Sequence, residues 1–212
     1  MEIRKIVITG GPCAGKTTAL ERIADTFTRL GYRVIFNPET ATELIPTGVA
    51  PWTCGSPFEY QRCQMILQRT KEEVFNYAVE TMPVDKVLMV WDRGLMDNRA
   101  YVSPEEFRIL VDEIYGGEDL NRRYEAVFHL VTAAKGAEEF YTTSNNTART
   151  ETVEEAAALD DKLLDCWKDH PYHRIIDNTG DFDHKMDRLI SEIADFLGET
   201  LPEDVDSGER PV

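Results

Sequence analysis

The sequence predicts a three-layer α/β fold, in which a five-stranded parallel sheet carries helices on both faces. Short β-branched segments alternate along the chain with longer segments that have the spacing of amphipathic helices. Parallel strands need right-handed crossover connections, and these place helices on the two faces of a sheet. We therefore expect one such domain over residues 1–198, with a lid and a tail as appendages.

Five segments have the composition of strands and are bounded by residues that favour turns: residues 3–9, 33–36, 87–91, 126–131 and 174–176. Helices are predicted at residues 17–30, 58–82, from 104 onward, 153–167 and 184–197. The helix over 58–82 has an apolar stripe, which we expect to face the core and which consists of Cys63, Ile66, Leu67, Val74 and Ala78.

The composition excludes several classes of function. Acidic residues outnumber basic ones 39 to 23, and the net charge of −16 repels nucleic acids and anionic membrane surfaces at long range. No apolar run is long enough to span a membrane, and the four cysteines lack the spacing of a disulfide framework. We therefore expect a cytoplasmic protein, whose acidic segment 199–212 is a disordered tail.

The first predicted strand leads into Gly10-Gly11-Pro12-Cys13-Ala14-Gly15-Lys16-Thr17, which fits the phosphate-loop pattern G-x-x-x-x-G-K-[ST]. Glycines let the backbone curl until successive N–H groups face phosphate oxygens, and the helix that begins here adds its positive end. Lys16 supplies a charge for the β- and γ-phosphates, and the Thr17 hydroxyl can ligate Mg²⁺. We expect nucleotide contacts from Gly11, Pro12, Cys13, Ala14, Gly15, Lys16, Thr17 and Thr18. The alternative is a glycine-rich turn with a solvated lysine.

A second signal follows the third predicted strand, which ends in Asp92-Arg93-Gly94. An acid at the end of a buried strand beside a phosphate loop is where a further Mg²⁺ ligand belongs, so Asp92 joins Thr17 as a candidate metal ligand. The alternative is that Asp92 caps the next helix. Asp97 can face the same cleft and contact a substrate, or it can form a surface ion pair with Arg99.

These motifs resemble those of the P-loop nucleoside and nucleotide kinases. The closer resemblance is to the AAA-type domain shared by ribosylnicotinamide kinase domains and the TRPL translocation defect proteins. It rests on the phosphate loop, on Asn37-Pro38-Glu39-Thr40, on Asp92-Arg93-Gly94 and on Ala148-Arg149-Thr150-Glu151. It covers about residues 3–197 and implies a P-loop NTPase fold with strand order 2-3-1-4-5 and a lid at about 136–151.

The resemblance also implies a role for each matching residue. Lys16 and the lid residue Arg149 would hold the transferring phosphoryl group, and Arg93 would contact phosphate or acceptor. Asn178 stands at the position that packs near the nucleotide base. Gly94 stands where these kinases often have serine, so one hydroxyl contact is missing from the pattern.

On the acceptor side, Glu39 stands where a kinase needs a group that accepts or orients the proton of the acceptor hydroxyl. The alternative is that it caps the following helix. Gln64 lies on the helix that lines the acceptor pocket in nucleoside kinases and can recognise a base, unless it belongs to a solvated face. Trp52 can stack on an acceptor ring or pack its own loop onto the core.

Three functions fit these residues. The leading one is a Mg²⁺-dependent kinase that transfers the γ-phosphoryl group of ATP to a hydroxyl of a small, nucleoside-like acceptor. The second is a non-catalytic nucleotide-binding switch or adaptor that could use GTP, although the sequence has no guanine-specific Asn-Lys-x-Asp motif. The third is an ATPase that drives a partner protein. The sequence names neither the acceptor nor the oligomeric state.

Overall fold

The structure, a computed structural model, describes residues 1–138 and 152–202. Its five strands form one sheet in the order β2-β3-β1-β4-β5, and all neighbouring strands are parallel. The strands are β1 (Glu2–Gly10), β2 (Arg33–Asn37), β3 (Lys86–Asp92), β4 (Ala126–Leu130) and β5 (His173–Ile176). The predicted parallel sheet and its 2-3-1-4-5 order are therefore confirmed.

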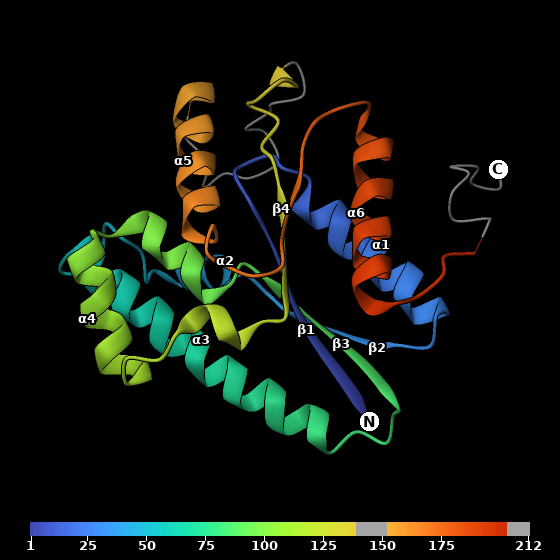
Figure 1. Cartoon of the computed structure of the whole chain (residues 1–212). Coiled ribbons are helices and arrows are strands. Elements are labelled where there is room, and N and C mark those ends of the chain that lie inside the picture. The colour runs from blue at the N-terminus through green and yellow to red at the C-terminus, as the bar shows by residue number, and fades with distance from the viewer. Residues whose placement is uncertain (139–151, 203–212) are drawn as a thin grey trace.

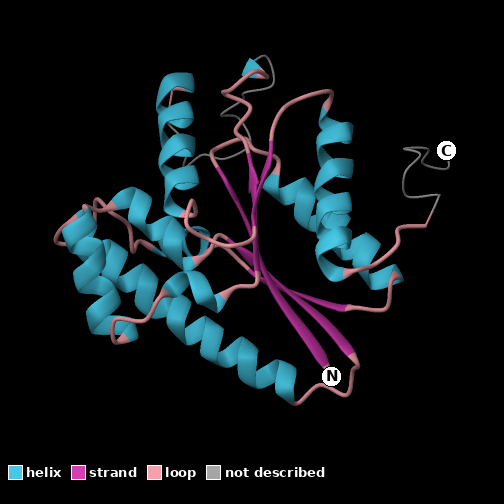
Figure 2. Cartoon of the chain, in the orientation of Figure 1, coloured by secondary structure: helices cyan, strands magenta, loops and turns pink. Residues whose placement is uncertain are grey.

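Helices connect the strands and cover both faces of the sheet (Figures 1 and 2). The α-helices are α1 (Lys16–Arg29), α2 (Thr40–Leu44), α3 (Pro57–Glu80), α4 (Pro104–Tyr115), α5 (Val153–Cys166) and α6 (Phe182–Leu197). Short 3-10 helices are η1 (Ile45–Thr47), η2 (Leu95–Tyr101) and η3 (Leu120–Arg123). Side-chain caps begin several of these helices: Ser103 and Thr152 each form a capping box, and Asp181 caps α6.

The two faces of the sheet belong to two separate apolar cores, because successive residues of a strand point to opposite faces. Ile6 and Ile8 of β1 pack on one face with Phe27 of α1 and with α6. Val7, between them, packs on the other face with Met65 of α3 and with α4. The sheet is thus the middle layer of three, and the carboxyl ends of its strands are left for the connecting loops.

The buried face of α3 is not the one that its apolar residues predict. Cys63 is exposed, and Ile66 and Val74 are 50% and 58% exposed, so the expectation that this stripe faces the core is wrong. The buried residues of α3 are Tyr60, Gln61, Gln64, Met65, Gln68, Glu72 and Val79. The amides among them can be buried because those of Gln61, Gln64 and Gln68 bond to Asn98.

The chain stays packed beyond residue 198, where the tail was expected to begin. Glu199 Oε1 accepts hydrogen bonds from Tyr32 Oη at 2.9 Å and from Lys86 Nζ at 2.6 Å. Leu201 packs against the core formed with α1 and α6. Residues 199–202 therefore belong to the folded part, contrary to the expectation, because Glu199 finds two donors there. Of the predicted lid, only residues 136–138 lie within the described part of the chain.

A helix able to span a membrane is also absent from this part of the chain. None of the helices in residues 1–138 and 152–202 combines the length and the apolar character needed to cross a bilayer.

Candidate functional site

The phosphate loop (residues 10–17) joins β1 to α1 with a backbone that requires glycine at two positions. Gly10 has a φ of +145°, and a Cβ there would lie 2.1 Å from the carbonyl oxygen of Leu130. Gly15 has a φ of +91°, and its Cβ would lie 2.6 Å from Cε2 of Phe182. The loop can therefore pass closely between β4 and α6 only without these side chains.

Three consecutive carbonyl oxygens of the loop, those of residues 12–14, accept hydrogen bonds from the rest of the protein. The donors are, in order, Thr132 Oγ1, Ala133 N at 3.3 Å and Lys185 Nζ at 3.1 Å. No peptide bond in the described residues is cis. The N–H groups of residues 13–15 therefore point to the side opposite these carbonyls. Successive N–H groups on one side of a loop form a concave site for an anion.

Two positive features lie where this loop meets α1. Lys16 is the first residue of the helix and is only 8% exposed. The helix N-terminus itself carries a partial positive charge. Thr17 is exposed and Thr18 is half-buried, so the Thr17 hydroxyl is open to a ligand. Buried cation, helix end and backbone N–H groups together make the chemistry of a phosphate site.

Asp92 ends β3 beside Ile8 of β1, next to the start of the phosphate loop. Burial raises the pKa of the Asp92 carboxyl group, and the neighbouring charge of Lys16 opposes that rise. Its Oδ1 is buried and has no hydrogen-bond partner within the described residues. A buried carboxylate oxygen with unused acceptor capacity suits a hard cation such as Mg²⁺, and so does the Thr17 hydroxyl.

The described ranges 1–138 and 152–202 contain no group of three or more His, Cys, Asp or Glu side chains able to hold a metal by themselves. A magnesium ion at Asp92 and Thr17 would therefore take its remaining ligands from phosphate oxygens and water, as Mg²⁺ commonly does.

Glu39 and Arg93 form an ion pair between Glu39 Oε1 and Arg93 Nε, with side chains only 20% and 11% exposed. Arg93 has a φ of +67°, and its backbone N–H donates to the carbonyl oxygen of Ile8 at 3.0 Å. Glu39 occupies the N-cap position of α2, but its side chain accepts no capping hydrogen bond. The capping alternative therefore does not describe its side chain.

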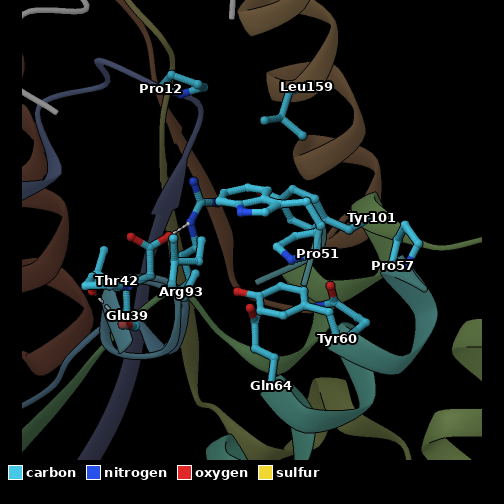
Figure 3. A pocket seen from close by; sticks show the side chains of 15 residues that line it. Pro12, Glu39, Thr42, Pro51, Pro57, Tyr60, Gln64, Arg93, Tyr101 and Leu159 are labelled. Atoms are coloured by element: carbon cyan, nitrogen blue, oxygen red, sulfur yellow. Dashed lines mark hydrogen bonds and ion pairs between the residues drawn. The ribbon is translucent and has the colours of Figure 1, made fainter. Parts of the chain in front are cut away.

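A cavity of about 430 Å³ opens beside this ion pair (Figure 3). Tyr60 and Gln64 rise into it from α3, and Leu159 reaches it from α5 on the opposite side. It brings together Glu39, Arg93, Trp52 and Gln64 with Pro12 of the phosphate loop. The remaining lining residues are Ala41, Thr42, Ile45, Pro46, Pro51, Pro57, Tyr60, Gln61, Tyr101 and Leu159.

Asp97 lies outside this cavity, contrary to the expectation that it contacts a substrate. It is 2% exposed, and its Oδ1 accepts hydrogen bonds from Thr9 Oγ1 at 2.7 Å and Trp167 Nε1 at 2.8 Å. Its Oδ2 accepts the backbone N–H of Gly94 at 2.9 Å. Asp97 therefore holds the turn after β3 onto β1. It also forms no surface pair, because Arg99 bonds to Asp165 instead.

Asn178 is engaged by protein groups at both ends of its amide. Its Nδ2 donates to the carbonyl oxygens of Thr132 at 2.8 Å and Lys135 at 2.7 Å, and its Oδ1 accepts from Lys185 Nζ at 2.7 Å. These bonds tie the segment after β5 to the segment after β4. Asn178 therefore shapes the backbone beside the phosphate loop, where a base contact was expected of its side chain.

The sequence analysis missed Asp160, a fully buried acid on α5. Its Oδ1 accepts hydrogen bonds from Gly11 N and from His129 Nε2, each at 2.9 Å, and its Oδ2 pairs with Lys135 Nζ at 2.9 Å. Burial alone would raise its pKa, but the bonds from His129 and Lys135 lower that pKa to about 2. Its position on the buried face of α5, between Ala156 and Leu163, was the available signal.

Arg149, expected on the lid, lies outside the described residues.

The fold and this site define a P-loop nucleotide-binding domain. A family model described as an AAA domain matches residues 5–185, and the chain belongs to that family. A search among curated proteins finds no match.

A solved structure that resembles this chain is a deoxyadenosine kinase from M. mycoides, with the products dCMP and a flexible dCDP bound. The TM-score is 0.61 at 16% sequence identity, over 90% of this chain and 99% of that one. At this identity the similarity shows the fold alone.

Replacing Asp97 with alanine should lower the free energy of unfolding by about 3 kcal/mol, because buried donors of Thr9, Trp167 and Gly94 lose their acceptor. Urea denaturation followed by tryptophan fluorescence measures the change. Asp165→Ala, which removes an exposed partner of Arg99 and Lys168, is the matched control and should change stability little. Equal losses in the two variants would contradict the anchoring role of Asp97.

Proposed function

We propose that this protein is a kinase that uses Mg²⁺ and ATP to phosphorylate a hydroxyl of a small, nucleoside-like acceptor. The observation that carries the proposal is the cavity of about 430 Å³ beside the phosphate loop, with Pro12, Glu39 and Arg93 all in its wall. A nucleotide switch needs the loop but no adjoining room for a second small molecule. A kinase needs both, with a charged pair between them.

On the donor side, the phosphate loop is expected to hold the triphosphate through the backbone N–H groups of residues 13–15 and the ammonium of Lys16. Thr17 and Asp92 would hold Mg²⁺, which neutralises charge on the phosphate oxygens when bound. The rest of the expected nucleotide contacts, Gly11, Pro12, Thr18, Asn178 and the lid residue Arg149, belong to the same proposal. Among them Asn178 acts by positioning backbone, as its hydrogen bonds indicate.

On the acceptor side, Glu39 is the group that takes the proton as the acceptor oxygen bonds to the γ-phosphorus. The bond from the γ-phosphorus to the β,γ-bridging oxygen breaks, and ADP leaves. The ion pair with Arg93 holds the Glu39 carboxylate in the wall of the cavity (Figure 3). Arg93 is also placed to meet a phosphate oxygen across the transferring group. Phosphoryl transfer asks mainly for such positioning and charge stabilisation, which the two side chains supply without covalent chemistry.

The cavity wall favours an acceptor that has a flat ring and a polar edge. Tyr60, Tyr101 and the largely exposed Trp52 supply aromatic faces, and Gln64 supplies an amide. Gln64 is held by its Nε2, which donates to Asn98 Oδ1 at 2.9 Å. A nucleoside combines such a ring with reactive hydroxyls. The structural similarity to a deoxyadenosine kinase supports this acceptor class, and the motif resemblance extends it to ribosylnicotinamide-like nucleosides.

Replacing Lys16 with alanine should abolish stabilisation by MgATP, because the loop loses the cation nearest the phosphates. A ligand at a hundredfold excess over Kd stabilises the folded state by about 2.7 kcal/mol, which a thermal-shift assay detects easily. GTP should be run beside ATP, since the donor base is not specified. Lys168→Ala, at an exposed lysine beyond α5, should retain the full shift. An unchanged shift in the Lys16 variant would refute the phosphate-site assignment.

Replacing Glu39 with glutamine should lower acceptor phosphorylation by about 10²–10⁴, because the side chain keeps its shape but can no longer accept the proton. The MgATP shift should stay nearly unchanged, because the phosphate loop keeps its own contacts. The measurement is a screen of nucleosides with the parent protein, followed by rates on the best acceptor. A variant as fast as the parent would remove Glu39 from the mechanism. A parent that binds MgATP and phosphorylates no acceptor would instead favour the switch.

A further inference from the structure

Lys185, in the first turn of α6, is a buried lysine that the proposed mechanism does not use. The side chain is 3% exposed, and helix α6 stands beside α1 on the same face of the sheet (Figure 1). Its Nζ donates to three oxygens: Val131 O at 2.6 Å, Asn178 Oδ1 at 2.7 Å and Ala14 O at 3.1 Å. All three oxygens are neutral. They satisfy the three N–H bonds of an ammonium ion but supply no counter-charge.

No carboxylate of residues 1–138 or 152–202 lies within ion-pair distance, 4.0 Å, of this ammonium. The charges that face it from the packed elements are Asp160 on α5, Asp177 after β5 and Arg188 on α6. Both acids have other partners: Asp160 pairs with Lys135 at 2.9 Å, and Asp177 pairs with Arg188 at 2.8 Å. Lys185 is thus a buried cation whose charge is not matched by a neighbouring acid.

Burial without a counter-charge is costly for an ammonium ion. Desolvation accordingly lowers the pKa of Lys185 to about 8. An anion bound nearby would stabilise the charged form of this lysine. The ligand site nearest to Lys185 is the phosphate loop, to which it bonds directly through Ala14.

We propose that Lys185 is a second buried cation of the phosphate site, and that the phosphates of a bound nucleotide balance its charge. The inference rests on the proposed function in one respect, that the loop binds a nucleotide. Lys185 is a positioning residue here, because it acts from behind the loop and through it.

The peptide group between Ala14 and Gly15 connects Lys185 to the anion site. The ammonium holds the carbonyl oxygen of Ala14, and the trans peptide directs the N–H of Gly15 to the opposite side. An ammonium on the carbonyl polarises the peptide and strengthens that N–H as a donor. Lys185 also holds Val131 and Asn178, so one charge fixes the loop and the segments after β4 and β5.

Nucleotide binding should therefore be linked to protonation of Lys185. A bound polyanion raises the pKa of the lysine above its value in the free protein. Affinity for the nucleotide is then greatest below pH 8. It falls as the pH rises from the pKa of Lys185 in the free protein toward its higher pKa in the nucleotide complex. The other titratable residues nearby are Cys13 and Lys16 in the loop and His129 in β4.

The first measurement uses the parent protein alone. Titration calorimetry of MgATP binding at pH 8.5, in two buffers of different ionisation enthalpy, gives the number of protons taken up. We expect uptake of about half a proton per nucleotide at pH 8.5 and a several-fold weaker affinity at pH 9 than at pH 7. Absence of uptake in the parent, or uptake that persists in the Lys185 variant described below, overturns the proposal.

The second measurement replaces Lys185 with methionine, which keeps the length of the side chain and removes its charge. We expect about tenfold weaker MgATP binding at pH 7 and no proton uptake at pH 8.5. Lys168→Met, an equal change in net charge at an exposed site, should bind and take up protons as the parent does. A folded Lys185 variant that binds as tightly as the parent overturns the proposal.

Failure of the proposed function and failure of the inference on Lys185 give different results in these measurements. A parent that binds no Mg-nucleotide refutes the proposed function, and the inference with it. A parent that binds MgATP without proton uptake refutes the inference alone, and this result stands even where Lys185→Met does not fold.

Discussion

The site depends on how the phosphate loop is held from behind. Three successive carbonyl oxygens, those of residues 12–14, accept hydrogen bonds from Thr132, Ala133 and Lys185. A tight loop cannot bond these carbonyls within itself, so without external donors they would face solvent or the ligand. Because they are bonded at the back, the N–H groups of residues 13–15 are turned to the front. The loop is therefore an anion site only in combination with the segment after β4 and with α6. The backbone of Gly10, pressed against Leu130 O, allows this close approach.

Two buried charges of opposite sign stand behind this loop and act on different parts of it. Asp160 accepts the N–H of Gly11, bonds to His129 and is paired with the ammonium of Lys135. Lys185 bonds the carbonyl of Ala14 and lacks such a neutralising partner within the described residues. Charges in a low-dielectric interior act strongly on nearby groups. The acid thus anchors the start of the loop, while the cation adds positive potential at its end, where α1 begins. This asymmetry gives the loop one end that is held in place and one end that favours an anion.

The sequence predicted what local patterns encode. Contiguous residues predict the strands and the phosphate loop, and the family resemblance predicts the order of the strands. The sheet in the structure agrees with these predictions. The sequence could not predict which face of α3 is buried. The amides of Gln61, Gln64 and Gln68 can be buried because they bond to Asn98, which lies far along the chain. The prediction that Asp97 contacts a substrate was wrong for the same reason, because two of its hydrogen-bond donors come from β1 and from the end of α5. Polar side chains take their roles from partners brought together by the tertiary fold, and spacing along one helix or loop does not reveal those partners.

The candidate site has two halves, the phosphate loop with its supports and the adjoining cavity, and the sequence predicts them unequally. The phosphate half centres on one connection, between β1 and α1, which a motif can identify although the segment after β4 and helix α6 hold it from behind. The cavity half is assembled from α2, η1, α3, η2 and α5, with the loop around Trp52 closing one side. The Glu39–Arg93 pair joins the segments after β2 and β3 in the wall of that cavity. Substitutions around the cavity can change its shape without disturbing the bonds that hold the phosphate loop. The shape of the cavity is thus free to vary beside a constant phosphate loop, and the motif that identifies the family does not indicate what the cavity binds.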